Sequence, residues 1–461
     1  MNPLRQLTLF DTTIIMVSFV IGMGIFRTPV NVAKAVSSPG IFFGAWIAGG
    51  IVALCGALTY AEIGSRLPVT GGYYKVFSYA YHPSIAFAVN CIILVSNAAS
   101  LAAVALVGGE YITGVLIPLL NIQQGVEPVG ATYIQTFQVS IAIAAIVIFY
   151  GVGLLGLKMS ARAQNVLMII KICMVVLLIS PLFFATGSNG ITQEIMHSTN
   201  PVLSEYLKAF GTGLVAVSFT YGGYQQTINF GEEVKDPGRT VPRAIFIGII
   251  IIIVLYLAIN YAYVKVIGFE ELKNAKNIAA IMASKVFGIN AERVLSVLLF
   301  MSVLGYVNIL LMSNPRVMAA MSYDKILPAT FGKRNSKTGV LTSSLTLFSA
   351  ICLLIIFWAK EFDTILSFTI FLDCFGMVFS AGSIFKIRKH TAHLNGTGIY
   401  SMKLYPLLPL IFIAAYTFVG ISIFVTETKT SLIALGVLAS FILLYFLVTR
   451  NANSNGKPAS I

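Results

Sequence analysis

The chain has 461 residues, of which 57% are hydrophobic and only 10% are charged, against about 25% charged residues in an ordinary soluble domain. This composition excludes a water-soluble fold with a polar surface and predicts an all-α membrane protein. The net charge of +13 does not indicate a nucleic-acid partner, because the basic residues gather in alternate loops, as membrane topology requires.

Twelve apolar stretches, each long enough to cross a hydrocarbon layer about 30 Å thick, follow one another along the chain. They are 8–37, 40–66, 84–117, 134–156, 161–186, 204–233, 241–267, 289–322, 339–360, 363–388, 403–426 and 429–450. An even number of spans places both ends on one side, and the lysines and arginines of that side predict that it is the cytoplasm. We therefore expect a multi-pass protein of the plasma or inner membrane, without a cleavable signal peptide.

The first and sixth spans contain glycines where a continuous helix disfavours them. The first reads VIGMGIF over residues 20–26 and the sixth reads FTYGGYQ over residues 219–225. Each glycine costs about 1 kcal/mol of helix propensity. Gly22 and Gly24 point to different faces of a helix, which favours an interruption over a packing stripe. In the second span, Gly44, Gly49, Gly50 and Gly56 fit close helix packing instead.

These two interruptions suggest an internal repeat. If spans 1–5 and 6–10 are copies of one unit, each copy begins with an interrupted helix, and an odd number of helices gives the copies opposite topology. The predicted divisions are a first five-helix repeat over 1–190, a second, inverted repeat over 200–390, helices 11 and 12 over 400–450, and a cytoplasmic tail over 451–461. Matched interruptions in inverted halves predict a transporter site at mid-membrane.

An interrupted helix exposes main-chain groups that lipid cannot satisfy. The N-terminal end of a half-helix carries N–H groups suited to a carboxylate, and a C-terminal end offers carbonyls suited to an ammonium group. Glycine lets a ligand approach the backbone closely. Two facing interruptions therefore predict a site for an α-amino acid, held by the two groups that all amino acids share.

Charged residues inside the apolar spans are candidates for function. Asp373 lies near the centre of the tenth span, where a carboxylate costs about 2.5 to 3.5 kcal/mol unless it faces a cavity, pairs or is protonated. Lys171 lies two turns into the fifth span and either faces the interior or extends to the interface. Glu62 and Glu110 lie nearer span ends, where each either pairs with a base or sits at the interface. Uncharged polar residues are expected to link helices, among them Asn97, Ser100, Asn260 and Asn308.

Other chemical signatures argue against an enzyme. The five cysteines, Cys55, Cys91, Cys173, Cys352 and Cys374, lie in apolar spans without metal-binding or disulfide spacing, so no metal and no cofactor are expected. Phosphate-binding loops and clustered catalytic motifs are missing from the sequence. Apolar residues recur at helical spacing over residues 278–286, at Ile278, Ile281, Met282 and Val286. This pattern predicts an amphipathic helix that is either an inert interfacial helix or part of an outer lid.

Four segments, in this order, resemble the amino acid–polyamine–organocation superfamily, and especially its L-type amino acid transporter branch. IGMGIF at 21–26 is similar to the family's IGSGIF, and LTYAEIG at 58–64, followed by Pro68 and GGYY at 71–74, is similar to its YAELG...P..GG.Y signature. FTYGGYQ at 219–225 with GEEVKDPGRTVPRA at 231–244 resembles FAYGGW...EEVKNPQRNIPRA. NPRVMAAM at 314–321, with LP at 327–328, resembles PRVLYAMARDGLLP.

The resemblance implies a LeuT-like fold of two inverted five-helix repeats plus two peripheral helices, with helices 1 and 6 broken. It implies that the substrate carboxylate lies at Val20, Ile21, Met23 and Gly24. The ammonium group would lie at Phe219, Thr220, Tyr221 and Gly222, with Phe219 closing over the substrate. Lys171 would occupy the place of a sodium ion in sodium-coupled relatives, and Asp373 would border the side-chain subsite, favouring small, polar or cationic side chains.

The implied function is sodium-independent secondary transport of L-amino acids by alternating access, as an exchanger or with protons. A polyamine or organic-cation transporter of the same fold and a non-translocating amino acid sensor remain alternatives. Met23 replaces the family's serine, which leaves more of the carboxylate binding to backbone N–H groups, and Tyr224 replaces a common tryptophan. The loop at 118–133 lacks the cysteine that links animal L-type members to an ancillary glycoprotein, so no covalently linked ancillary subunit is expected.

Overall fold

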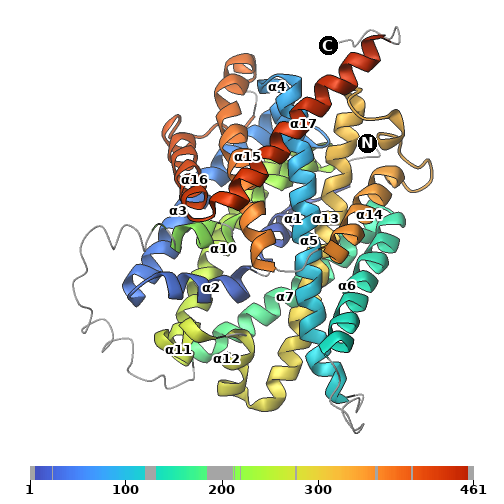
Figure 1. The fold of residues 1–461 in the computed structure, drawn as a ribbon. Coiled ribbons are helices and arrows are strands. Elements are labelled where there is room, and N and C mark those ends of the chain that lie inside the picture. Colours follow the sequence, from blue (N-terminus) through green and yellow to red (C-terminus); the bar gives the residue numbers. More distant parts are fainter. Residues whose placement is uncertain are drawn as a thin grey trace.

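The computed structural model describes residues 6–22, 24–119, 131–183, 211, 213–218, 220–275, 278–358, 362–395 and 398–454, and it is a bundle of helices (Figure 1). Within these residues, ten helical stretches are long and apolar enough to cross a membrane. They are Leu9–Ala35, Pro39–Arg66, Pro83–Ile117, Tyr133–Leu154, Leu157–Phe183, Pro237–Ile267, Arg293–Tyr323, Phe368–His390, Leu407–Thr426 and Thr428–Leu447. The chain is therefore an all-helical, multi-pass membrane protein.

Two of the twelve expected spans do not count among these ten. The ninth corresponds to an apolar helix of 17 residues, Thr342–Trp358, which is slightly shorter than the others. In the expected sixth span, 204–233, residues 204–210, 212 and 219 lie outside the described residues, and the described part changes from α-helix to 3₁₀ helix at residues 222–223. A total of twelve spans consequently stays a prediction.

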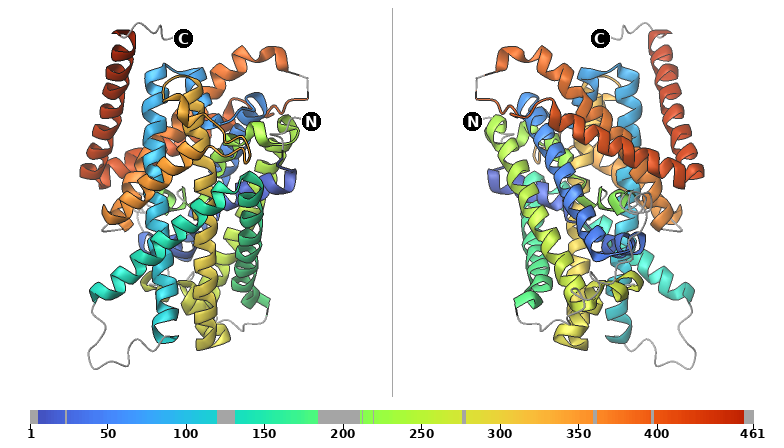
Figure 2. Two further views of the ribbon diagram at one scale, coloured as in Figure 1. Left: turned by 90° about the vertical axis from the view of Figure 1, so that its right-hand side faces the viewer. Right: turned by 90° about the vertical axis from the view of Figure 1, so that its left-hand side faces the viewer.

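The helices are, in chain order, α1 (Leu9–Val20), α2 (Gly24–Ala35), α3 (Pro39–Arg66), α4 (Gly72–Ala80), α5 (Pro83–Leu119), α6 (Ala131–Leu154), α7 (Leu157–Ile179), η1 (Ser180–Phe183), η2 (Tyr224–Asn229), η3 (Gly231–Glu233), α10 (Pro237–Ile267), α11 (Phe269–Asn274), α12 (Ile278–Phe287), α13 (Ile289–Tyr323), η4 (Ala329–Phe331), α14 (Thr342–Trp358), α15 (Phe362–His390), η5 (Ala392–Leu394), α16 (Leu407–Thr426) and α17 (Thr428–Ser454). The long helices α5 and α13 run side by side through the bundle (Figures 1 and 2). Helix α4 and the end of α17 lie at one end of the bundle, and α11 and α12 lie at the other (Figure 1).

Local sequence fixes where α1 begins. The Thr8 hydroxyl accepts a hydrogen bond from the Asp11 N–H at 3.2 Å, and the Asp11 carboxylate accepts one from the Thr8 N–H at 3.0 Å. This reciprocal pair is a capping box, which satisfies backbone donors that a helix start leaves without partners. The Asp11 carboxylate also accepts a bond from Asn165 of α7 at 2.9 Å. The start of α1 is thereby held against α7.

Gly49 and Gly56 of α3 permit close packing, as the sequence predicts, whereas a Cβ added at Gly44 would meet nothing within 4 Å, which contradicts the prediction for Gly44. A Cβ added at Gly49 would lie 2.2 Å from a methyl carbon of Val217, and one at Gly56 would lie 2.1 Å from the Tyr224 hydroxyl oxygen. Neither approach leaves room for a side chain. Helix α3 thus packs against the chain on both sides of the glycine pair 222–223.

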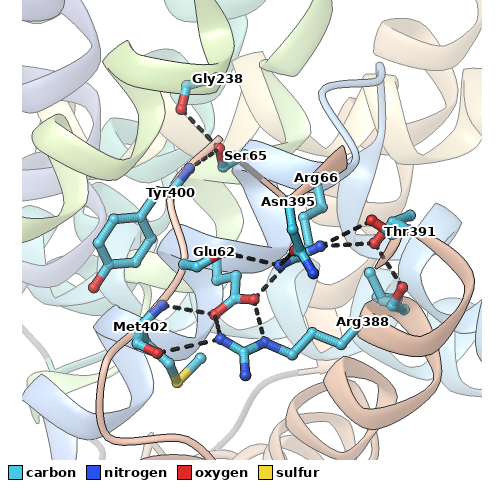
Figure 3. Close-up of polar contacts among 11 residues, drawn as sticks. Glu62, Ser65, Arg66, Gly238, Arg388, Thr391, Asn395, Tyr400 and Met402 are labelled. Atoms are coloured by element: carbon cyan, nitrogen blue, oxygen red, sulfur yellow. Dashed lines mark hydrogen bonds and ion pairs between the residues drawn. The ribbon is translucent and has the colours of Figure 1, made fainter. Parts of the chain in front are cut away.

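A buried ionic cluster joins α3 to α15 and to the chain before α16 (Figure 3). The Glu62 carboxylate, fully buried, accepts bonds from Arg66 at 2.8 Å, from Arg388 at 2.6 Å and from the Met402 N–H at 2.9 Å. Arg66 also donates to the Thr391 hydroxyl at 3.0 Å. Of the two expectations for Glu62, pairing with nearby bases is therefore the one observed.

A second ionic cluster ties the N-terminal segment to α13. The Glu233 carboxylate accepts bonds from Arg316 of α13 at 2.6 Å and from Arg334 at 3.3 Å. The Glu233 main-chain carbonyl accepts the N–H groups of Gln6 and Leu7, each at 2.9 Å. Glu233 therefore contacts both the start of the described chain, at Gln6 and Leu7, and Arg316 of α13.

The segment expected to be amphipathic forms α12. Its residues Ile278 and Met282 are buried, and α12 contacts α10, α13 and α2. The neighbouring short helix α11 also contacts α2. Both short helices therefore pack against the helix that follows the first interruption.

Candidate functional site

The first membrane span is interrupted at the predicted place. Helix α1 ends at Val20 and α2 begins at Gly24. The Val20 carbonyl oxygen accepts a hydrogen bond from the Tyr256 hydroxyl of α10 at 2.9 Å, and the Ile21 carbonyl oxygen accepts one from the Lys171 ammonium group of α7. Protein donors thus satisfy the Val20 and Ile21 carbonyls at the end of α1. The N–H groups that begin α2 have no intrahelical acceptors.

The second interruption lies at the glycine pair of residues 222–223. Residues 213–218 and 220–221 are helical, Gly222 and Gly223 are not, and the 3₁₀ segment η2 follows. Gly223 has a φ of +112°, a conformation that side chains disfavour, and a Cβ there would lie 2.5 Å from the Phe19 carbonyl oxygen. The second interruption can therefore approach the end of α1 only because position 223 lacks a side chain.

The two interruptions face each other. A Cβ added at Gly24 would lie 3.1 Å from the Thr220 side chain and 3.3 Å from the Thr220 Cα. On the other side of the same contact, Gly223 lies against Phe19. The start of α2 therefore lies beside Thr220, and the end of α1 lies beside Gly223.

A cavity of about 100 Å³ lies at this junction. Polar residues from α2, α5, η2 and α15 and apolar residues from α1, α5, α13 and α15 both contribute to its wall. The lining residues are Phe19, Val20, Gly22, Gly24, Arg27, Thr28, Asn31, Ser96, Asn97, Ser100, Ala103, Val104, Ser218, Thr220, Gly222, Gly223, Gln225, Gln226, Tyr306, Leu310, Thr369, Ile370, Asp373, Met377 and Tyr416.

The structure brings several of the sequence-predicted site residues into this wall. They are Val20, Gly24, Thr220, Gly222 and Asp373. Ile21 is fully buried, and its carbonyl oxygen accepts the bond from Lys171. The Tyr221 ring packs against Trp46 and Tyr256, with ring centroids 5.9 and 5.2 Å away. Met23 and Phe219 lie outside the described residues. The binding roles of all these residues stay predictions.

Asp373 presents a carboxylate to the cavity from α15. Its nearest hydrogen-bond donor among the described residues is the Ser96 hydroxyl of α5, at 3.4 Å. This distance is at the long end of the normal range for a hydroxyl donor. The carboxylate can therefore accept further bonds from a ligand.

Lys171 is fully buried, which excludes the alternative of a lysine extending to the interface. A Cβ added at Gly305 of α13 would lie 3.8 Å from the Lys171 nitrogen. The ammonium group thus lies between the end of α1 and the middle of α13.

Two of the four polar residues expected to link helices do so by joining α5 to α13, and a third joins α13 to α7. Asn97 donates to Asn314 at 2.7 Å, and Ser100 bonds the Tyr306 hydroxyl at 2.8 Å. Asn308 donates to Gln164 of α7 at 2.7 Å. Asn260 instead donates to the Tyr256 carbonyl within its own helix. Asn97 and Ser100 also line the cavity, a second role that their positions alone did not indicate.

On the cavity-facing side of α2, sequence reasoning identified Gly24 but missed Arg27, Thr28 and Asn31. Gly24, Arg27, Thr28 and Asn31 are spaced i, i+3, i+4 and i+7, so they share one face of the helix, and all four line the cavity. This spacing is a signal that the sequence carries. It becomes informative only once the helix is known to restart at Gly24.

Comparison with known proteins shows which sequences this chain resembles. Residues 7–448 match a family model described as "Amino acid permease". The Serine/threonine exchanger SteT of Bacillus subtilis (strain 168) is 26% identical over 429 residues, which is 92% of each chain. The Large neutral amino acids transporter small subunit 2 of Mus musculus is 25% identical over 453 residues, 96% of this chain and 81% of the relative. The Methylthioribose transporter of Bacillus subtilis (strain 168) is 27% identical over 335 residues, 71% and 69% of the two chains.

Proposed function

Since the chain belongs to the amino acid permease family of the amino acid–polyamine–organocation superfamily, we propose that it moves L-amino acids across the cell membrane by alternating access. The proposed mode is sodium-independent secondary transport, by exchange or with protons. Exchange is the mode named for the Bacillus subtilis serine/threonine relative, which this chain matches along nearly its whole length.

The observation that carries this proposal is the cavity between the two facing interruptions. On one side α2 begins at Gly24, where N–H groups lack intrahelical acceptors and a carboxylate is favoured. On the other side the helix that contains Thr220 ends at Tyr221, just before Gly222, and carbonyl oxygens there can accept bonds from an ammonium group. A zwitterion matches both ends. In this proposal Val20, Ile21, Met23 and Gly24 serve the carboxylate, and Phe219, Thr220, Tyr221 and Gly222 serve the ammonium group.

The wall of the cavity supports small, polar or cationic side chains as substrates. Ser96, Thr369 and Asp373 line the part of the cavity beside α15. A buried carboxylate costs free energy unless it finds partners, and the bond from Ser96 to Asp373 is long at 3.4 Å, so Asp373 disfavours a large apolar side chain. A polyamine or organic-cation substrate remains the alternative within the fold, because Asp373 suits a second positive charge.

Lys171 supports the absence of sodium coupling. Its ammonium group donates to the Ile21 carbonyl at the end of α1, and it lies beside Gly305 of α13. A fixed positive charge at this junction satisfies the carbonyl that a bound cation would otherwise satisfy. We propose that Lys171 takes the part of that cation.

The proposed architecture has twelve spans, two inverted five-helix repeats over 1–190 and 200–390, and peripheral helices α16 and α17. Both termini and the tail 451–461 are proposed to lie in the cytoplasm. The end of α17 lies at the α4 end of the bundle in Figure 1, and the proposal assigns this end to the cytoplasm. We also propose that the protein works without a disulfide-linked subunit, because residues 118–133 contain no cysteine.

A flux experiment tests the proposal. The purified chain is reconstituted into vesicles, and uptake of each of the twenty labelled amino acids is measured with and without internal substrate, in sodium and in choline buffers. Exchange predicts uptake that requires internal substrate and is equal in both buffers. Uptake without internal substrate that follows an imposed pH gradient supports proton coupling instead.

The alternatives give different results in the same vesicles. Saturable binding of an amino acid without any flux would support a sensor. Uptake of a labelled polyamine with no uptake of amino acids would support the organic-cation alternative. Either result contradicts amino acid transport.

A further inference from the structure

Arg27 is a charged cavity residue to which the proposed function gives no part. It lies on α2 and lines the cavity together with Gly24, Thr28 and Asn31, one helix face. An arginine near the centre of a membrane span costs about 2.5 to 3.5 kcal/mol on insertion scales. Arginines inside membrane spans therefore face a cavity or a partner, and a functional role is the first explanation to test.

The position of Arg27 relative to the start of α2 limits what it can reach. Helical side chains lean toward the helix N-terminus, so a residue covers the turn before its own Cα. For Arg27 that turn begins at Gly24, where the N–H groups without intrahelical acceptors lie. Gly24 itself has no side chain to fill the space. Arg27 and the helix N-terminus at Gly24 therefore line the same cavity, and both favour an anion.

We propose that Arg27 binds the α-carboxylate of the substrate together with the N–H groups that begin α2. This inference rests on the proposed function and deepens it, since it restricts the substrates to compounds with a free carboxylate. A guanidinium group binds a carboxylate through two parallel hydrogen bonds. It also supplies a donor that this chain lacks at position 23, where methionine stands in place of the family's serine.

The competing role for Arg27 is structural. Glu110 of α5 interacts electrostatically with Arg27, so the arginine could serve only to hold α2 against α5. In that case, removing the charge of Glu110 would have the same effect as removing the charge of Arg27. A carboxylate-binding role makes a different prediction, because it depends on a group of the ligand.

The experiment compares ligands with and without the carboxylate. Binding of the twenty amino acids to the purified full-length protein identifies the tightest ligand, and its carboxamide is then measured as the matched probe. The variants are Arg27→Gln, Arg27→Lys and Glu110→Gln, with Arg243→Gln as the control at an exposed arginine of α10. Size-exclusion profiles establish that each variant is folded.

A hydrogen bond to a charged group contributes about 1.5 to 3 kcal/mol, so Arg27→Gln should weaken binding of the amino acid about 10- to 100-fold. Affinity for the carboxamide should change far less, so that the preference of the protein for the carboxylate falls by the same factor. Arg27→Lys should keep part of this preference, and it decides the question if Arg27→Gln does not fold. Arg243→Gln should bind like the wild type.

Several results would overturn the inference. Equal weakening for both ligands, unchanged binding in Arg27→Gln, or the same loss in Glu110→Gln would each assign Arg27 a structural role. A wild-type protein that binds none of the twenty amino acids would refute the proposed function as well. The first group of results leaves amino acid transport intact, so the two failures are distinguishable.

Discussion

Gly223 and Lys171 each make one contact that shapes the paired interruptions. Gly223 lies against the Phe19 carbonyl with a positive φ, and Lys171 donates to the Ile21 carbonyl. Both contacts involve the last turn of α1 and its exit. The geometry of the cavity therefore depends on these residues even though the Lys171 side chain lies outside the cavity wall.

Gly223→Ala should abolish substrate binding. A Cβ at this position would lie 2.5 Å from the Phe19 carbonyl oxygen, so the two interrupted segments would have to separate. The matched control is Gly268→Ala, because Gly268 also has a positive φ, +93°, but a Cβ there would meet nothing within 4 Å. Binding of labelled amino acid to purified protein measures both. If the two variants bind alike, the close approach does not shape the site.

Lys171→Ala should weaken substrate binding about 10- to 100-fold, because the Ile21 carbonyl loses a charged donor at the interruption. Lys265→Ala is the control, since Lys265 also donates to a main-chain carbonyl, that of Leu182, away from the site. Binding is measured in sodium and in choline buffers. Partial rescue by sodium would show that a cation can replace the ammonium group, and full activity of Lys171→Ala would refute its proposed part.

At the scale of elements, glycine positions predict the interruption of the first span and the packing of α3, and apolar residues at helical spacing predict the amphipathic α12. They do not predict which groups meet across the bundle. Gly223 shows this limit, because its partner Phe19 lies about 200 residues earlier in the chain and no local pattern joins them. Arg27 shows another, because its face of α2 is defined only after the helix start is known.

The cluster around Glu62 should hold α3 and α15 together. Breaking a buried ion pair by removing one partner costs about 3 to 5 kcal/mol, since the other charge stays buried without compensation. Glu62→Gln should therefore lower the free energy of unfolding of the purified protein by about 3 to 5 kcal/mol, which a thermal unfolding measurement detects. Glu270→Gln is the control, because its pair with Lys273 lies at the surface, with 70% of the Glu270 side chain exposed, and should contribute at most about 1 kcal/mol. Equal stability of the two variants would contradict a structural part for the cluster.

At the scale of the whole molecule, the proposed topology places both termini on the side opposite α11 and α12. Epitope tags at the two ends should be reached by antibody only after the cells are permeabilised. A tag inserted between Lys273 and Asn274 of α11 should be reached on intact cells. Labelling of either terminus on intact cells would reverse the proposed orientation.

Glu233 has a consequence for how the molecule can move. Its main chain holds Gln6 and Leu7, and its carboxylate holds Arg316 and Arg334. If Gln6 and Leu7 separate from α13 during transport, the Glu233 contacts break and a buried charge is uncovered. If these contacts persist, the N-terminal residues and α13 have to move as a unit.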